Sequence, residues 1–341
     1  MSHRFLPYLW TSLFLLVAIV LSVAIGSVFI PLLSQLRLLA DWLMRRPLPD
    51  SLQTFASIIS AIRLPRTALV LLTGAALGGS GAADQGLFRN PLADPYLIGV
   101  ASGAGLGAVL AMSLNWPYSF WGLMAVPLAA FCAALATVFV VYSLARLGKT
   151  VPTTNLILAG VAFGSFASAL TSYLMLRSTG DLHRAIAWML GGASQAGWSP
   201  VLAVLPFLAI GLGILVLSGH SLNLMQYGDD QAQQLGLHVT RARTVILVAA
   251  SLTTAAAVSF SGIIGFIGLI VPHVMRLWFG ADYRRLLPLS ILSGAGALLL
   301  ADVLARTLLA PQELPVGIIT ALAGAPFFLW VLRRTKNQGY W

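Results

Sequence analysis

Charged side chains are scarce in this sequence. Asp, Glu, Lys and Arg make up 9% of the 341 residues, whereas hydrophobic residues make up 58%. Soluble domains carry about 25% charged residues, so the composition excludes an ordinary soluble protein. All four charged residue types are missing from five stretches: 5–36, 95–145, 150–176, 185–228 and 244–275. Because an α-helix crosses the hydrocarbon core of a lipid bilayer with about 20 residues, the longer stretches must hold more than one crossing.

Catalytic and metal-binding groups are also few. Cys132 is the single cysteine, which excludes an intrachain disulfide and a cysteine metal cluster. The five histidines lie in different segments without an H-E-x-x-H pattern, and Glu313 is the only glutamate. The G-x-x-x-x-G-K-[ST] phosphate loop of ATPases is absent from the sequence. We therefore expect no catalytic residue, no metal site and no cofactor bound by this chain.

Basic residues outnumber acidic ones, and the net charge is +10. This excess would suggest nucleic acid as the partner of a soluble protein, but in a membrane protein it indicates which loops face the cytoplasm. We expect no nucleic-acid partner. Arg4 precedes the first apolar stretch, and Arg333, Arg334 and Lys336 follow the last, so both termini are expected to be cytoplasmic and the number of spans even.

Polar residues and Pro/Gly breaks divide the apolar stretches into ten predicted spans. They are residues 9–30, 67–83, 96–112, 120–143, 153–176, 199–218, 244–261, 263–277, 288–307 and 315–332. Residues 244–275 could also form one long tilted helix, but an even number of spans favours two helices that meet at Ser261-Gly262. No ionisable residue is expected at the centre of a span, since Asp302, Arg306 and His273 all lie towards span ends. The sequence predicts an all-α polytopic membrane protein with about ten transmembrane helices and both termini in the cytoplasm.

Glycine is abundant, at 32 residues, and clusters at helical spacing. The clusters are "SGAGLG" at 102–107, "GIIGFIG" at 262–268 and "SGAGA" at 293–297. Small residues let helix backbones approach closely in lipid. We interpret these clusters as close packing surfaces without chemistry of their own.

The polar residues gather in one internal loop, 219–243, which contains "NLMQYGDDQAQQLGLHVTRAR" at 223–243. Asp230 followed by Gln233 fits a capping box, Gly236 can end a short helix, and Thr240 can cap the next span. One or two short polar helices are therefore predicted at the cytoplasmic surface. A solvated turn is the alternative, but connections between packed helices need only about 2 to 8 residues. The extra length favours a surface for a partner.

Several blocks of the sequence, in order, resemble the FecCD family. They are "RLPRT" at 63–67, "GLFRNPLADPYLIGVASGAG" at 86–105, "NLILAGVAFG" at 155–164, "YGDDQAQQLGLHV" at 227–239, "GIIGFIGLIVPHVMR" at 262–276 and "ELPVGIITALAGAPFFLWVL" at 313–332. Members of this family are the membrane subunits of ATP-binding-cassette (ABC) importers for iron chelates, haem and cobalamin. The resemblance covers residues 63–334, and the preceding part of the chain matches by position only.

The resemblance implies one permease domain over residues 1–341 in the inner membrane of a bacterium. A second permease subunit would pair with it, either a second copy, which makes a homodimer, or a paralogue, which makes a pseudo-dimer. Two ATPase subunits, which use ATP and Mg, would bind on the cytoplasmic side, and a substrate-binding protein on the other side. Loop 219–243 would couple the permease to the ATPases through seven residues of its central part: Asp229, Asp230, Gln231, Gln233, Gln234, Leu235 and Gly236.

The resemblance also implies roles for residues near both ends of the spans. Arg63, Arg66 and Arg306 would receive acidic side chains of the binding protein. Cations at a helix N-terminus oppose the helix dipole, so local helix stability does not explain the first two. For Arg306 an ion pair with Asp302, four residues earlier, is the structural alternative. The inner gate would be formed by four residues: Asn90, Leu92, Thr153 and Thr154.

One residue departs from the family pattern. Asp84 lies where an apolar residue is expected, and we expect it either to pair with Arg89 or to face the translocation pathway. The alternative function is an ion-coupled secondary transporter of a small solute. Such transporters need ionisable or coordinating groups near the membrane midplane, and their predicted absence there argues against this function.

Overall fold

The computed structural model describes residues 5–26, 29–44, 49–114, 120–148, 151–177, 182–192 and 197–336. Helices dominate these ranges, which contain no β-strand. The predicted all-α class is confirmed.

Each of the ten predicted spans overlaps one apolar helix in the described ranges, although several helix ends differ from the prediction by three to six residues. Seven are long and apolar enough to cross a membrane: α1 (Leu6–Ala24), α4 (Leu64–Leu87), α6 (Phe120–Ala145), α7 (Thr153–Arg177), α9 (Ser199–Leu217), α12 (Val239–Ser261) and α14 (Tyr283–Thr307). Three are shorter: α5 (Val100–Met112), α13 (Ile267–Phe279) and α15 (Val316–Lys336). The chain is a multi-pass membrane protein.

The predicted break within 244–275 is confirmed. Gly262 ends α12 with a φ of 67°, a backbone conformation that residues with a side chain rarely adopt. A Cβ atom on Gly262 would also lie 2.0 Å from the Trp188 carbonyl oxygen. A single long helix through this stretch is therefore excluded.

Six shorter elements connect the spans: α2 (Leu32–Leu43), α3 (Asp50–Ile58), the π-helical turn η1 (Ile59–Arg63), α8 (Leu182–Met189), α10 (Gly219–Met225) and α11 (Asp229–Gln234). The rod formed by α3, η1 and α4 runs without interruption from Asp50 to Leu87, so the predicted start of the second span at residue 67 is wrong. The helix continues through Arg63 and Arg66 because both side chains find partners inside the protein.

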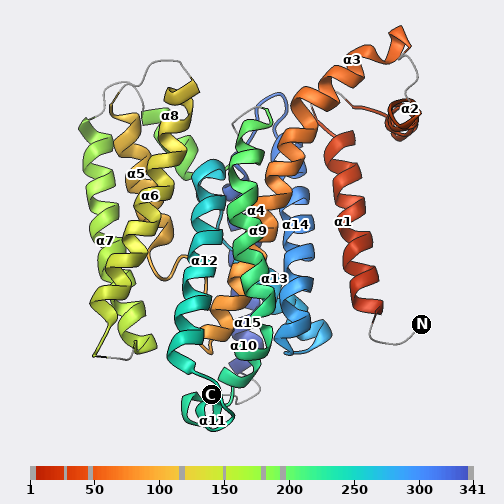
Figure 1. Ribbon diagram of the computed structural model, residues 1–341. Helices are drawn as coiled ribbons and strands as arrows, with labels where there is room; N and C mark the ends of the chain where they lie inside the picture. Colours follow the sequence, from red (N-terminus) through yellow and green to blue (C-terminus); the bar gives the residue numbers. More distant parts are fainter. Residues whose placement is uncertain are drawn as a thin grey trace.

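α2 lies crosswise to α1 at the end of the molecule opposite α11 (Figure 1). Its leucines at positions 32, 36, 39 and 43 fall on one helical face and are all more than half exposed. Leu38, on another face, is buried. An amphipathic helix oriented in this way has the geometry of an interfacial helix.

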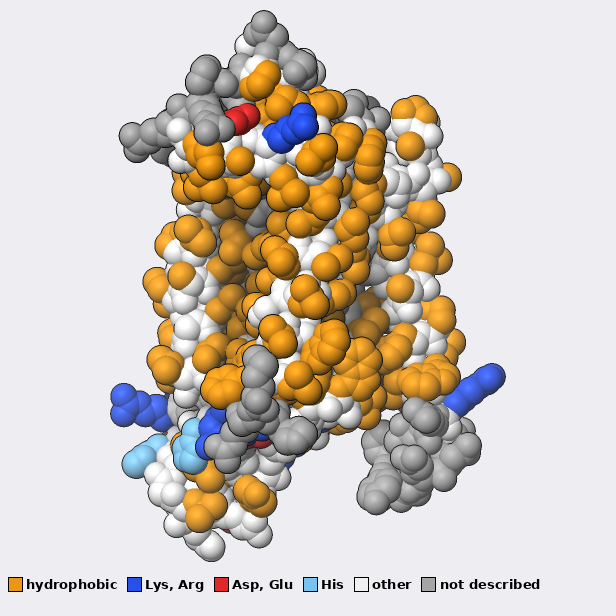
Figure 2. Space-filling view, turned by 90° about the vertical axis from the view of Figure 1, so that its right-hand side faces the viewer, with side chains coloured by type: hydrophobic (Ala, Val, Ile, Leu, Met, Phe, Trp, Pro, Cys, Tyr) orange, Lys and Arg blue, Asp and Glu red, His pale blue; other side chains and the backbone are white. Residues whose placement is uncertain are grey.

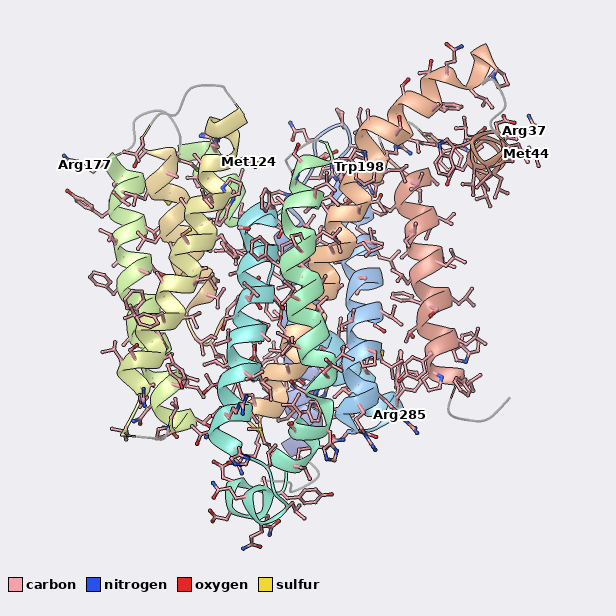
Figure 3. All side chains as sticks on the ribbon, in the orientation of Figure 1. Arg37, Met44, Met124, Arg177, Trp198 and Arg285 are labelled. Carbon is pink, nitrogen blue, oxygen red and sulfur yellow. The ribbon has the colours of Figure 1, made fainter. Side chains whose placement is uncertain are left out.

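The two ends of the molecule differ in their elements. α11 marks one end, and α3 and α8 lie at the other end (Figure 1). We call these the α11 end and the α8 end. Arg285 lies at the α11 end, whereas Arg37 and Arg177 lie at the α8 end (Figure 3). Between them, hydrophobic side chains cover the middle of the face seen in Figure 2, and charged side chains lie near its two ends.

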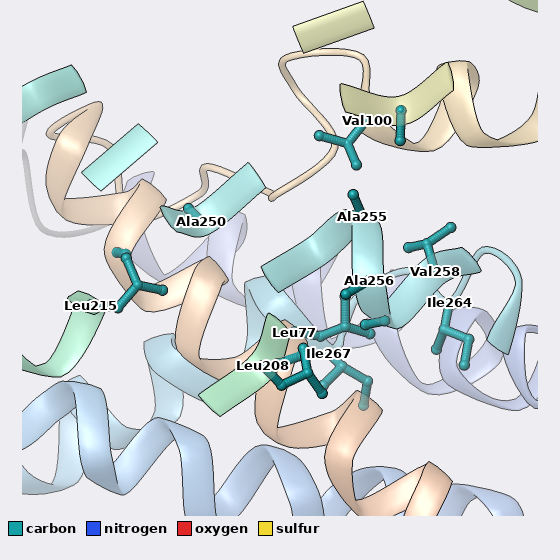
Figure 4. Close-up of a cluster of buried hydrophobic side chains, with 14 of the residues drawn as sticks. Leu77, Val100, Leu208, Leu215, Ala250, Ala255, Ala256, Val258, Ile264 and Ile267 are labelled. Atoms are coloured by element: carbon teal, nitrogen blue, oxygen red, sulfur yellow. The ribbon is translucent and has the colours of Figure 1, made fainter. Parts of the chain in front are cut away.

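α4 is the central helix of the fold. Every residue from Thr73 to Leu87 is buried, because α14, α12, α13 and α9 all pack on this helix. Leu77 of α4 meets Leu208 of α9 and Ile267 of α13 in the core (Figure 4).

Glycine brings α4 into backbone contact with its neighbours. A Cβ atom on Gly74 would lie 2.4 Å from the carbonyl oxygen of Gly294, and one on Gly81 would lie 2.0 Å from that of Gly268. A Cβ atom on Gly103 would lie 2.2 Å from Oγ1 of Thr137. Close approach of this kind replaces the hydrophobic driving force that helices lack inside lipid. The predicted packing role is confirmed for most of the clustered glycines, whereas a Cβ atom on Gly265 would meet nothing within 4 Å.

Candidate functional site

At the α11 end, loop 219–243 is an ordered structure. α10 and α11 form within it, as the sequence predicts. Gly236, with a φ of 87°, follows the end of α11, and the Leu237 amide donates to the Ala232 carbonyl.

Two predicted helix caps in this loop are wrong. α11 begins at Asp229 with Gly228 in the N-cap position, so Asp230 is not the cap. α12 begins at Val239, with His238 rather than Thr240 in the N-cap position. Gly228 adopts a positive φ of 102° in the N-cap position, and α11 starts two residues earlier than the capping box implies.

Most of the predicted coupling residues are exposed. Asp230, Gln231, Gln233, Gln234, Leu235 and Gly236 all face outward, whereas Ala232 is buried. Tyr227, which the sequence analysis did not single out, is 67% exposed, and Leu235 is 62% exposed. An open groove of about 720 Å³ begins at Gln233 and Gly236 of this segment and continues along the start of α12, where Arg241 lines it. The outer face of α11 therefore combines amide groups with two large exposed side chains next to a groove.

Asp229 differs from its neighbours because it turns inward. Its Oδ1 and Oδ2 accept hydrogen bonds from Nη2 of Arg243, at 3.0 and 2.9 Å. Nη2 of Arg89 lies 3.4 Å from the same Oδ1. The carboxylate thereby joins α11 to α12 and to the connection between α4 and α5.

Asn223 attaches the same loop to α14. Its amide nitrogen donates to Oδ1 of Asp282 at 2.6 Å, and its amide oxygen accepts from the Tyr283 backbone amide at 2.8 Å. Asp282 is the N-cap of α14. Hydrogen bonds from Arg284, followed by the one from Asn223, lower the pKa of the Asp282 carboxyl well below its usual value. This cap was not predicted from the sequence, because Asp282 lies six residues before the predicted start of the span at residue 288.

The predicted gate residues lie at the ends of two segments near α11. Oδ1 of Asn90 accepts from the Leu92 amide at 2.9 Å and forms the turn that follows α4. Thr153 is the first residue of α7, and Thr154 follows it as an exposed residue.

Tyr96 fixes the connection between α4 and α5. Its hydroxyl donates to the Ile264 carbonyl at 2.9 Å and accepts from the Ile264 amide at 3.2 Å, which ties the connection to the break between α12 and α13. Nothing in the local sequence pattern pointed to this contact.

Two expectations for ionisable residues are corrected. The expected pair between Asp84 and Arg89 is wrong, since Arg89 pairs with Asp229 while Asp84 is fully buried and its Oδ1 has no hydrogen-bond partner. His273 does not lie towards a helix end but in the middle of α13, where its ring meets Phe327 edge-on.

At the α8 end, two of the three predicted docking arginines hold the end of α1. Arg63 donates to the carbonyl oxygens of Val23 and Ala24. Arg306 donates to the carbonyl oxygens of Ser22 at 3.2 Å and Ile25 at 3.1 Å. The last carbonyls of a helix lack partners within the helix, and cations there are favourable. Arg63 and Arg306 therefore compensate the carbonyl groups at the C-terminal end of α1, which is distant in sequence. This explains the positive charge of Arg63, which is unfavourable at the N-terminal end of its own helix α4.

Asp302 is the counterion at this end. Its carboxylate is fully buried and lies 2.9 Å from Nη2 of Arg66 and 3.0 Å from Nε of Arg306, which confirms the predicted pair with Arg306. The Nε hydrogen of Arg306 points to the Asp302 carbonyl oxygen, at 3.3 Å, so the contact with Oδ2 is an ion pair rather than a directed hydrogen bond.

Arg66 is the most exposed of the three arginines. Its side chain is 19% exposed, compared with 6% for Arg306, and Arg63 is 5% exposed as a residue. Besides Asp302, Arg66 pairs with Glu313 at 2.7 Å, whose side chain is half exposed. Arg66 therefore lies where an external acidic group could compete with Glu313.

Known proteins resemble this chain over nearly its whole length. An uncharacterised ABC transporter permease of Bacillus subtilis, YvrB, is 43% identical and covers 99% of this chain and 96% of its own. The hemin transport permease HmuU of Yersinia pestis is 43% identical over 81% of this chain and 83% of its own. The vitamin B12 import permease BtuC of Klebsiella pneumoniae is 39% identical over 96% of this chain and 93% of its own.

Structural and family comparisons agree with these relatives. A solved ABC transporter of metal-chelate type, in an inward-facing conformation, superposes with a TM-score of 0.80 at 29% identity and covers 96% of this chain and 98% of its own. The family model described as the FecCD transport family matches residues 14–334. The match includes part of α1, from residue 14 onward. The sequence blocks that carried the resemblance begin only at residue 63, so α1 had matched the family by position alone. This chain belongs to the FecCD transport family.

Proposed function

We propose that this chain is the membrane-spanning permease subunit of an ABC importer, which carries an iron chelate, haem or cobalamin across the bacterial inner membrane by alternating access. The observation that carries the proposal is the all-α multi-pass fold, shared at a TM-score of 0.80 with a metal-chelate type ABC transporter, together with an ordered polar helix exposed at one end. Because relatives named for hemin and for vitamin B12 have similar identities to this chain, the cargo is proposed only as this class.

The exposed face of α11 is proposed to contact the ATPase. Its amide side chains offer both donors and acceptors, and Tyr227 and Leu235 add apolar area beside the groove. Two ATPase subunits, one for each of two permease copies, would use ATP and Mg. Residues 219–243 are the coupling loop within the single permease domain of residues 1–341.

The inner gate is proposed to form between two copies of Asn90 and Leu92 on one side and Thr153 and Thr154 on the other. These residues follow α4 and begin α7, and helix ends of this kind move when their helices tilt. The α8 end is then the outer end, where a substrate-binding protein would dock. Its acidic groups would meet Arg66 first, with Arg63 and Arg306 behind it.

ATP hydrolysis in lipid nanodiscs tests this function. The chain and its ATPase would be purified together and titrated with binding proteins loaded with haemin, cyanocobalamin or a ferric siderophore. We expect one loaded binding protein to stimulate hydrolysis and thereby to identify the cargo. Failure to form an ATPase complex with the wild-type chain would contradict the proposal.

The docking role of Arg66 gives a separate expected result. The Arg66→Gln substitution should raise the concentration of loaded binding protein that gives half-maximal stimulation by about tenfold, because one charge pair across an interface is lost. Arg177→Gln is the matched control, since Arg177 lies at the same end (Figure 3) but outside the Asp302 cluster. It should change this concentration by less than about twofold. Equal effects of the two substitutions would contradict a specific docking site at Arg66.

A further inference from the structure

Asp229 occupies a different position from the other acidic residue of α11. It is the first residue of the helix, and its carboxylate receives both hydrogen bonds from Arg243, whose side chain is 11% exposed. Asp230, the next residue, is exposed. One acid of this pair therefore faces the proposed ATPase, and the other faces the permease.

The first partner of Asp229 leads to one predicted gate segment. Arg243 extends from the first turns of α12, and its Nη1 also lies 3.4 Å from the Val151 carbonyl oxygen. Val151 precedes Thr153, the first residue of α7, by two positions. A displacement of Asp229 therefore reaches the start of α7 through a single side chain.

The second partner leads to the other gate segment. Arg89 lies 3.4 Å from Oδ1 of Asp229 and directly precedes Asn90. Its φ is 51°, a conformation that costs free energy for a residue with a side chain and persists only where the surroundings impose it. Its amide donates to the Gly86 carbonyl at 3.2 Å, so the backbone at Arg89 is fixed to the end of α4. A displacement of the Arg89 guanidinium is therefore expected to move the turn at Asn90 together with the end of α4.

The two contacts differ in strength. In the contact with Arg243, Nη2 reaches both oxygens of the carboxylate at 3.0 and 2.9 Å, and the Arg243 side chain is only 11% exposed, which makes this the stronger contact of the two. The contact with Arg89 is longer, and its side chains are 44% and 35% exposed, so solvent weakens it. We therefore expect a displacement of Asp229 to affect the start of α7, through Arg243, more than the turn at Asn90, through Arg89.

We propose that Asp229 is a positioning residue through which a displacement of α11 is transmitted to both inner gate segments, by Arg243 to the start of α7 and by Arg89 to the turn at Asn90. This inference rests on the proposed function. Glycines with positive φ, Gly228 and Gly236, flank α11 and let it move as a short rigid unit. Without Asp229, this unit would keep its outer face but lose its charged link to the gates.

The test compares ATP consumption with transport in proteoliposomes that contain the permease, its ATPase and the binding protein. Uptake of haemin, cyanocobalamin and a ferric siderophore would be measured together with phosphate release. With uptake and phosphate release compared in the same preparation, we expect Asp229→Asn to lower the number of cargo molecules moved per ATP about tenfold. Asp229→Glu should restore at least half of this ratio, because it keeps the charge.

Two further substitutions sharpen the test. Arg89→Gln should lower the ratio less than Arg243→Gln does, because its contact with Asp229 is the weaker one. Arg285→Gln is the matched control at the same end of the molecule (Figure 3), since Arg285 is exposed and has no ion pair among the described residues; it should leave the ratio unchanged.

The outcomes separate this inference from the proposed function. An unchanged ratio in Asp229→Asn, with hydrolysis and transport falling in proportion or not at all, would overturn the role of Asp229 as the link to the gates. A wild-type chain that forms no complex with the ATPase, or that moves none of the three cargoes in any ATP-dependent way, would overturn the proposed function itself.

Discussion

Replacing Asp302 with asparagine is expected to be among the most destabilising single substitutions in this protein. The Asp302 carboxylate is fully buried and is the shared counterion of Arg66 and Arg306. Removing one partner of a buried ion pair leaves an uncompensated charge and costs about 3–5 kcal/mol. Arg306 also holds the end of α1, so this loss should loosen α1 as well. Thermal unfolding of the purified protein in detergent would measure the effect.

Asp84→Asn is the matched control for this prediction. Asp84 is as deeply buried as Asp302, but its Oδ1 has no hydrogen-bond partner, and no ion pair involves it in the part of the chain that the structure describes. Replacing an unpaired buried carboxyl by a neutral amide removes no counterion and should leave the unfolding temperature unchanged or raise it. Equal losses of stability in the two variants would show that Asp302 is not the counterion of the arginine cluster.

Gly81→Ala is expected to destabilise the packing around α4. A Cβ atom on Gly81 would lie 2.0 Å from the Gly268 carbonyl oxygen, which belongs to the backbone and cannot rotate away. α4 and α13 would have to separate, and overpacking of this kind costs about 1–3 kcal/mol or more. Thermal unfolding in detergent, with size-exclusion chromatography of the folded fraction, would measure the loss.

Gly213→Ala makes the same chemical change as Gly81→Ala but is expected to stabilise the protein. Gly213 lies within α9, and a Cβ atom there would meet nothing within 4 Å. Because alanine restricts the unfolded chain, the substitution should stabilise the helix by about 0.4–1 kcal/mol. A destabilisation at Gly213 as large as that at Gly81 would mean that the loss comes from something other than contact between backbones.

The spans could be predicted from the sequence because each requires a long apolar run, and the runs end at polar or Pro/Gly breaks. The break at Gly262 was predictable for this reason, as was the exposure of Gln231 and Gln234, which lie in the most polar loop of the chain. The length of the rod from Asp50 was not, because Arg63 and Arg66 interrupt its apolar run and only a folded neighbour explains their charges.

Contacts between distant segments were the part that the sequence could not supply. Arg306 and the carbonyl of Ile25 are separated by 281 positions, and Tyr96 and Ile264 by 168. No local periodicity connects such residues, and backbone carbonyls have no sequence signature at all. The resemblance identified Arg63 and Arg306 as functional but gave no sign that they hold α1.

The buried ionisable groups were misjudged for a related reason. Span boundaries set Asp84 at the end of a predicted helix, whereas α4 continues to Leu87 and encloses it. His273 lies at the centre of a helix that begins four residues later than predicted. Two ionisable groups inside the bundle weaken the sequence argument against an ion-coupled transporter, so the energy source must be tested directly.

The most direct test is uptake into proteoliposomes that contain the permease, its ATPase and the loaded binding protein, measured with and without ATP and with and without a proton or sodium gradient. The proposed function predicts that uptake requires ATP with Mg and continues when ionophores collapse the gradients. Uptake that proceeds without ATP and stops when the ion gradient is collapsed would contradict it and would identify an ion-coupled transporter.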